Sequence, residues 1–223
     1  MQEGWIYTRL GDVCRTQGKL DEAITLYQSA IQCQKDVDHP YYQGFSYKGL
    51  GWTYLRQNKL IEAEAALQIA LKFHKRVNSL LHQGNVFQLL GEVYMALHKV
   101  EVATGAFQNA LEFHKAANDA QGQGNDYENL GKIFLSQDKL NEAESSFKKA
   151  LELHTVAQDA LAQGHDCSYL GKLYMKKGQL FDAKKMFEKA IDLHNKEQDS
   201  AAEGQDVEYL NVVIIKMKEY GIL

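Results

Sequence analysis

The chain has 223 residues, of which 45% are hydrophobic and 24% are charged, as in a globular protein with a sizeable core. Its formal net charge of −4 argues against a nucleic-acid partner, which would favour a basic surface. Apolar runs are only a few residues long, and the start of the chain lacks a signal pattern, so neither membrane insertion nor secretion is predicted. Three cysteines without C-x-x-C spacing indicate a reducing compartment, and we expect a cytoplasmic protein: Cys14, Cys33 and Cys167.

A forty-residue repeat runs through the whole sequence. Glycine marks it, at Gly4, Gly44, Gly84, Gly124, Gly164 and Gly204. Because the period contains no insertion, the sequence predicts a single domain over residues 1–223. We place the repeats at about 1–38, 39–78, 79–118, 119–158 and 159–198, with a closing helix at 199–223.

Each repeat divides into two helices. The first follows a capping position, which is occupied by His39, Ser79, Asp119, Asp159 and Asp199. Four of these are favoured N-cap types, and the only proline, Pro40, follows the exception. First helices are therefore predicted to start near residues 40, 80, 120, 160 and 200.

A short turn separates the two helices of a repeat, as in "QGKL", "QNKL" and "QDKL". Glycine, asparagine or aspartate there suits a left-handed residue at a helix C-terminus. The second helix then carries small or apolar residues on one face, for example Ala143, Phe147, Ala150 and His154. This face is predicted to pack against the first helix.

At least two glycines lie inside each of the first five first helices, although a glycine there costs about 1 kcal/mol relative to alanine. Gly124 and Gly131 are seven residues apart and so share a helix face with Tyr127, Leu130 and Phe134. We expect the glycines to allow a close approach of the second helix.

The pattern formed by Tyr127, Leu130, Gly131, Phe134, Ala143, Phe147 and Ala150 resembles the tetratricopeptide repeat. The forty-residue period is similar to long-repeat variants in Pins/LGN-type scaffolds, bacterial peptide-pheromone receptors and, most of all, sensor arrays of fungal NLR-like proteins. This resemblance implies an all-α, right-handed superhelix (an α-solenoid) of five helix-turn-helix repeats plus a terminal helix. It also implies a non-catalytic scaffold, adaptor or sensor that binds a protein or peptide in a concave groove lined by first helices.

Positions that face the groove in the family imply the partner-binding residues of this chain. They are Trp5, Phe45, Lys48, Trp52, Leu55, Arg56, Met95, Lys132, Leu135, Lys172, Met175 and Lys176. Aromatic and methionine side chains suit an amphipathic partner, and the lysines suit a partly acidic one. Two alternatives remain: Trp5 and Phe45 cover the first repeat, and the leucine and methionine residues pack between first helices.

Two departures from the residues usual in the family limit the range of possible partners. Members that hold the C-terminal tails of Hsp70 or Hsp90 carry a lysine and an asparagine four residues apart, whereas here Trp52 follows Lys48. We therefore expect no such carboxylate clamp. Pins/LGN-type repeats favour asparagine after Leu-Gly, but this chain has Asp12, Trp52, Glu92, Lys132 and Lys172 there, which argues against their partners.

Histidine recurs once per repeat, at His74, His114, His154 and His194. Equivalent positions on stacked helices lie on the order of 8–10 Å apart, whereas one zinc needs donors about 2 Å from it. We interpret the histidines as packing residues that donate to terminal carbonyls, with a pH-sensing stack or a metal site as the alternatives. Motifs for nucleotide or metal chemistry are absent from the sequence, so neither an enzyme nor a cofactor is predicted.

The closing helix is apolar around its circumference, with Val212, Val213, Ile214, Ile215 and Met217. A terminal repeat normally has a polar outer face, because nothing stacks on it. This predicts either self-association through residues 205–223 or truncation from a longer array. The alternative function is accordingly that of an architectural self-assembly module.

Overall fold

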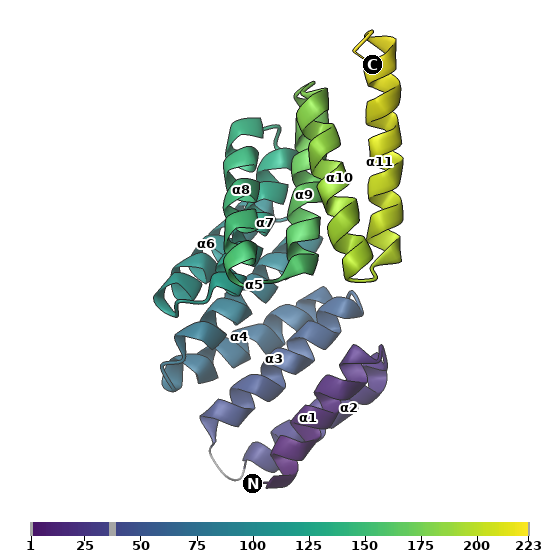
Figure 1. Ribbon diagram of the computed structural model, residues 1–223. Helices are drawn as coiled ribbons and strands as arrows, with labels where there is room; N and C mark the ends of the chain where they lie inside the picture. Colours follow the sequence, from purple (N-terminus) through teal and green to yellow (C-terminus); the bar gives the residue numbers. More distant parts are fainter. Residues whose placement is uncertain (1, 36–38, 223) are drawn as a thin grey trace. The chain divides into compact units, whose positions relative to one another are not determined.

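The computed structural model describes residues 2–35 and 39–222, which form eleven helices and no strand (Figure 1). Their bounds are α1 (Gln2–Thr16), α2 (Leu20–Lys35), α3 (Pro40–Arg56), α4 (Leu60–Arg76), α5 (Leu80–Ala96), α6 (Val100–Ala116), α7 (Ala120–Ser136), α8 (Leu140–Val156), α9 (Ala160–Lys176), α10 (Leu180–Lys196) and α11 (Ser200–Glu219). The predicted starts of the first helices are thus confirmed. The end predicted for the first repeat, residue 38, lies outside the described residues. Within the described ranges, none of the helices combines the length and apolar character needed to cross a bilayer.

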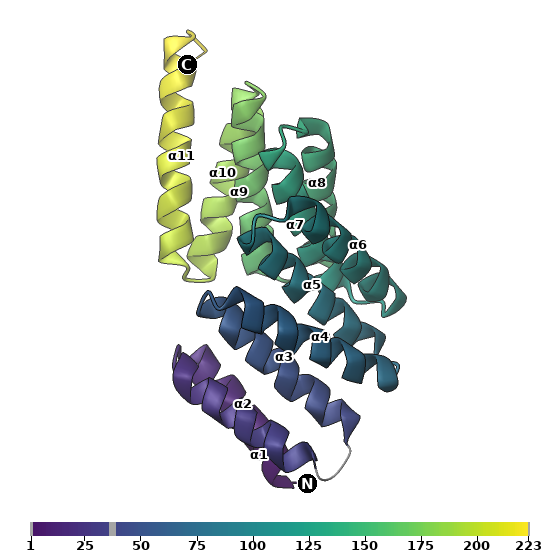
Figure 2. The ribbon, with the colours of Figure 1, turned by 180° about the vertical axis from the view of Figure 1, so that it is seen from behind.

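The chain packs as two units, unit 1 (residues 1–118) and unit 2 (residues 119–223). Unit 1 contains the helix pairs α1/α2, α3/α4 and α5/α6, and unit 2 contains α7/α8, α9/α10 and the single helix α11. Consecutive helices within a unit lie side by side, as Figures 1 and 2 both show. The predicted all-α class, built from paired helices of the α-solenoid type, is confirmed.

Residues in the left-handed conformation, with positive φ, follow the helices both within and between the pairs. Inside the pairs they are Gly18, Asn58, His98, Asp138 and Gly178, all with φ between 58° and 76°. This confirms the predicted turn. The connections after α4, α6, α8 and α10 use the same conformation at Asn78, Asn118, Gln158 and Gln198, which the sequence analysis did not anticipate.

Side-chain capping occurs at fewer first helices than the sequence indicated. Asp159 accepts a hydrogen bond from the backbone N–H of Ala162, and Asp199 accepts one from that of Ala202. Ser79 does not cap α5, because its hydroxyl bonds the Nδ1 of His82 at 2.6 Å. The residue at the N-cap position therefore marks the start of each helix, but its side chain does not always accept a capping hydrogen bond.

Close packing of rings on glycines joins the two helices of a pair. A Cβ on Gly131 would lie 2.6 Å from the ring of Phe147, and one on Gly171 would lie 2.7 Å from that of Phe187. Such distances are far below van der Waals contact, so only glycine fits without rearrangement. The expected close approach is confirmed.

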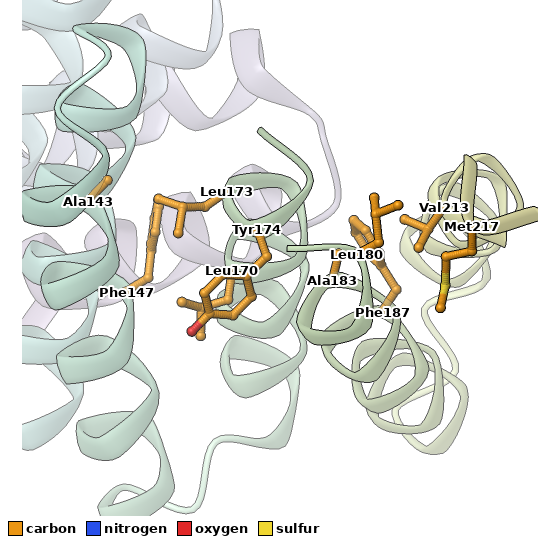
Figure 3. Packing of buried hydrophobic residues seen from close by; sticks show 10 residues of the cluster. All are labelled: Ala143, Phe147, Leu170, Leu173, Tyr174, Leu180, Ala183, Phe187, Val213 and Met217. Atoms are coloured by element: carbon orange, nitrogen blue, oxygen red, sulfur yellow. The ribbon is translucent and has the colours of Figure 1, made fainter. Parts of the chain in front are cut away.

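The core of unit 2 continues from α8 through α9 and α10 to α11 (Figure 3). Val213 and Met217 of α11 are fully buried and belong to the same cluster as Phe187. One side of the closing helix is therefore buried in the core of unit 2. Its other side leaves apolar residues exposed: Val207, Val212, Ile215 and Tyr220.

Candidate functional site

Most of the predicted groove residues line three hollows formed mainly by first helices. The unit 1 hollow lies between α3 and α5 and has a volume of about 370 Å³. It is lined by Lys48, Trp52, Arg56, Asn85, Gln88, Leu89 and Glu92. The structure thus brings three predicted residues together here: Lys48, Trp52 and Arg56.

Trp52 is the aromatic residue among those that line the unit 1 hollow. One side of the indole is half-buried against the cluster that contains Leu67 and Leu89, and the guanidinium of Arg15 lies 3.7 Å from the ring centroid. Burial lowers the pKa of Lys48, and although Asp12 opposes this shift, Arg15 reinforces it. Trp52 is therefore part packing residue and part accessible surface.

Trp5 and Phe45 line none of these hollows. Instead they belong to an aromatic cluster in which Trp5 lies 5.1 Å from Tyr42, and Phe45 lies 4.5 Å from His82. Phe45 also meets the ring of His74 edge-on at 5.5 Å. Burial is the main cause that lowers the pKa of His74 to about 3 and that of His82 to about 4, so both stay neutral near pH 7.

Two further predicted residues also lie outside the hollows. Leu55 packs against the unit 1 core, and Met95 is half-buried on α5. For Leu55, packing between helices accounts for the apolar side chain.

The polar pocket of unit 2 has a volume of about 320 Å³ and is lined by residues of α7, α9, α10 and α11. Its lining comprises Glu128, Lys132, His165, Ser168, Tyr169, Lys172, His194, Ala202, Gln205 and Asp206. Both carboxylates in this lining are engaged: Glu128 pairs with Lys132, and Asp206 accepts bonds from Ser168 and His194.

Lys172 stands apart from those ion pairs. Its ammonium lies 5.3 Å from the ring centroid of Tyr169 and 4.8 Å from that of Tyr209. Burial lowers the pKa of Lys172, while the charge of Asp206 acts in the opposite direction. Among the described residues no carboxylate forms an ion pair with it, so two aromatic faces are its main close partners.

The lysine-ringed hollow of unit 2 adjoins the polar pocket at Lys172 and has a volume of about 390 Å³. Leu135, Met175 and Tyr209 supply apolar surface, and Lys172, Lys176 and Lys216 surround it. Leu135 and Met175 also pack on the unit 2 core, so packing between helices accounts for part of their apolar surface.

Each recurring histidine packs on the glycine that lies thirty residues before it in the sequence. In α10, the ring of His194 occupies the space where a Cβ on Gly164 would be, at 2.5 Å from Nε2. His154 bonds Asp166 of the next repeat through Nδ1 at 2.6 Å and Asn125 through Nε2 at 3.1 Å. These partners replace the terminal carbonyls that we expected, so that part of the interpretation is wrong.

The side chains of His154 and Asp166 are both fully buried, and this burial affects the pKa of each. Burial raises the pKa of Asp166 to about 6, against the attraction of His154. Burial alone would lower the pKa of His154, but the bond to Asp166 and nearby carboxylates outweigh it and raise that pKa. Because both ring nitrogens face acceptor oxygens, the geometry favours an imidazolium bonded to a carboxylate.

One group of donors, Glu128, His154 and Asp166, lies close enough to be tested as a metal site, with ligand atoms within 4.8 Å of one another. Hydrogen bonding accounts for its geometry better, because Nδ1 of His154 already bonds Asp166 and the ammonium of Lys132 pairs with Glu128. A metal ion would have to displace both contacts.

Ser168, His194 and Asp206 also meet in the polar pocket, but not as a nucleophilic triad. Ser168 donates to Oδ2 of Asp206, and Nδ1 of His194 bonds the same oxygen. A serine nucleophile needs the imidazole itself as its base. The three residues instead join α9, α10 and α11.

The sequence analysis missed these inter-repeat bonds. Asp166 and Asp206 are both buried and bonded to histidine, and neither was among the predicted site residues. A signal was present, because each aspartate follows its histidine by twelve residues. The aromatic partners of Lys172, Tyr169 and Tyr209, were also missed.

Three solved structures illustrate the similarity of the fold. The apo form of RapI superposes with a TM-score of 0.82 at 14% identity, over 99% of this chain and 85% of that one. A Rap protein complexed with Competence and Sporulation Factor gives 0.78 at 16% identity, over 98% and 65%. A STAND protein with a tetratricopeptide repeat sensor from Pyrococcus horikoshii gives 0.79 at 17% identity, over 94% of this chain and 33% of that one.

Sequence comparison identifies the family directly. We found no curated protein of similar sequence. A family model described as tetratricopeptide repeat matches residues 2–76 and 82–155, and a second model with this description matches residues 170–196. These matches cover most of the repeats defined above, and the chain therefore belongs to the tetratricopeptide repeat family.

Proposed function

We propose that the chain is a non-catalytic binding module that holds a protein or peptide segment against its first helices, as a cytoplasmic scaffold or sensor. The observation that carries this proposal is the gathering of predicted groove residues in the hollows of both units. Each hollow combines an apolar surface with cationic side chains at its edge, as a site for an amphipathic segment would.

The Rap protein complexed with Competence and Sporulation Factor is a precedent for a bound partner on a similar fold. That factor is a partner of the Rap protein. For this chain, we rely on the accessible parts of Trp52, Leu135 and Met175, which are the types of side chain that anchor partners.

A selection from a random peptide library displayed on phage tests the proposal. The intact chain is immobilised, and enriched peptides are measured by fluorescence anisotropy against Trp52→Ala and Met175→Ser. We expect at least a fivefold weaker affinity in one of the two variants. The matched controls are Ile61→Ser and Phe181→Ser, which change exposed apolar residues on second helices.

The result that would overturn the proposal is equally concrete. It is wrong if no peptide is enriched, or if the controls weaken binding as much as the groove variants. Circular dichroism at the assay temperature establishes that each variant is folded, so a loss of binding is not mistaken for a loss of structure.

We also propose self-assembly through residues 205–223 as a second candidate function. It rests on the exposed apolar residues of α11, among them Val212 and Ile215. Sedimentation velocity over a range of concentrations should show association that Ile215→Lys abolishes. A chain that remains monomeric at high concentration would exclude it.

A further inference from the structure

The lysine-ringed hollow of unit 2 has an unusual charge for a chain whose net charge is −4. Three of the residues that line it are lysines, from α9 and α11, and none is an aspartate or glutamate. Lys176 pairs with Asp138 at 2.7 Å, with both side chains well exposed. Neither Lys172 nor Lys216 forms an ion pair among the described residues.

The surface between these lysines is apolar. Leu135 and Met175 lie one repeat apart on α7 and α9 and pack on the unit 2 core, and Tyr209 stacks on Phe187 with a centroid distance of 5.5 Å. Their positions are therefore supported from below by buried side chains. An apolar side chain that entered the hollow would displace water from a preformed surface.

Lys172 connects this apolar surface to the polar pocket. Its ammonium lies between Tyr169 and Tyr209, and it lines both cavities. In the polar pocket the carboxylate of Glu128 pairs with Lys132, and that of Asp206 bonds Ser168 and His194, so the charge of Asp206 acts on Lys172 without a direct ion pair. A ligand carboxylate beside the hollow would supply that counter-charge at a partly desolvated position, where a charge-assisted hydrogen bond is strong.

From this complementarity we infer that unit 2 recognises a peptide segment in which an apolar side chain is flanked by carboxylates. The apolar side chain occupies the surface of Leu135, Met175 and Tyr209, and the carboxylates lie against Lys172 and Lys216. This inference rests on the proposed function and deepens it, because it specifies the chemistry of the partner. The unit 1 hollow differs, since Glu92 is among its lining residues.

Synthetic peptides of equal length test the inference directly. The acidic probe is a fluorescein-labelled, C-terminally amidated dodecapeptide with one leucine between two pairs of glutamates. In one comparison peptide glutamine replaces the glutamates, and in another serine replaces the leucine. A fourth peptide is the glutamine version with a free C-terminal carboxylate after its leucine, which distinguishes a chain terminus from acidic side chains as the source of the anion.

We expect the intact chain to bind the acidic probe at least tenfold more tightly than each of the three comparison peptides. The preference should diminish as salt is raised, because partly exposed ion pairs are screened. Lys172→Ala and Lys216→Ala should each weaken binding of the preferred peptide about fivefold. Lys185→Ala, which changes an exposed lysine on α10 outside both cavities, should leave it unchanged.

Lys216 is exposed, so its removal tests charge without altering the core even if Lys172→Ala is unstable. Equal affinity for the acidic and glutamine peptides, or equal losses in Lys216→Ala and Lys185→Ala, would overturn the inference. If library peptides without carboxylates bind and Met175→Ser abolishes their binding, the anionic preference is wrong while the proposed function stands. If no peptide from any source binds, both fail together.

Discussion

Substituting the first glycine of a repeat tests the packing of histidine on glycine, because the chain contains its own control. Gly164 in α9 and Gly204 in α11 occupy equivalent positions forty residues apart. A Cβ on Gly164 would lie 2.5 Å from Nε2 of His194, whereas a Cβ on Gly204 would meet nothing within 4 Å. The same substitution by alanine therefore adds a methyl group to occupied space at Gly164 and to open space at Gly204.

The two substitutions should change the free energy of unfolding in opposite directions. Alanine favours a helix over glycine by about 1 kcal/mol at either site. At Gly164 the displaced ring should cost about 1–3 kcal/mol through overpacking, and straining its bond to Asp206 should cost roughly 1–3 kcal/mol more. We expect Gly164→Ala to lower the free energy of unfolding by about 1–5 kcal/mol and Gly204→Ala to raise it by about 1 kcal/mol.

Urea denaturation followed by far-ultraviolet circular dichroism measures both values. The double variant Gly164→Ala/His194→Ala supplies a further control, since removing the ring should relieve the overpacking but leave Asp206 without its imidazole. Equal stabilisation by Gly164→Ala and Gly204→Ala would refute the reasoning, because the ring would then move aside at no cost.

Three more predictions concern other contacts. The folded state raises the pKa of both His154 and Asp166, so it binds protons more tightly than the unfolded state does. The stability of the wild type relative to the double variant His154→Gln/Asp166→Asn should therefore fall as the pH rises from about 4 to 8. Thermal melts in which this difference grows with pH would contradict the prediction. Adding zinc chloride should leave the melting temperature unchanged, since Lys132 and His154 already satisfy the acidic groups near them; a rise that Asp166→Asn abolishes would instead indicate a metal site. Asp159→Ala should cost about 1 kcal/mol of unfolding free energy, and Ser79→Ala should cost less because Ser79 does not cap its helix; equal losses in urea melts would count against this.

The forty-residue period accounts for what could be predicted. Helix starts, the left-handed turns at Gly18 and Asn58, and the glycines under Phe147 and Phe187 all depend on neighbours within one repeat, where sequence spacing and spatial proximity agree. The family resemblance then placed side chains such as Lys172 and Met175 on the first-helix face, and the structure finds both in a hollow.

What escaped prediction depends on contacts between repeats. The bond from His154 to Asp166 requires knowing which side of one repeat meets the next, which helix periodicity alone does not specify. Trp5 and Phe45 lie at first-helix positions comparable with that of Trp52, yet neighbouring rings of Tyr42 and His82 draw them into a cluster. Capping failed at Ser79 for a similar reason, because a histidine three residues later competes for its hydroxyl.

The packing of His194 on Gly164, thirty residues earlier, and of Phe187 on Gly171, sixteen residues earlier, also fixes the register of α9 and α10. Sliding one helix past the other by a turn would set the ring of His194 against a side chain instead of Gly164, and the ring of Phe187 would leave Gly171 at the same moment. A single inserted residue in either helix would break one of these matches, whereas the gain or loss of forty residues would preserve both. The array can therefore gain or lose whole repeats without disturbing how the helices pair within each one.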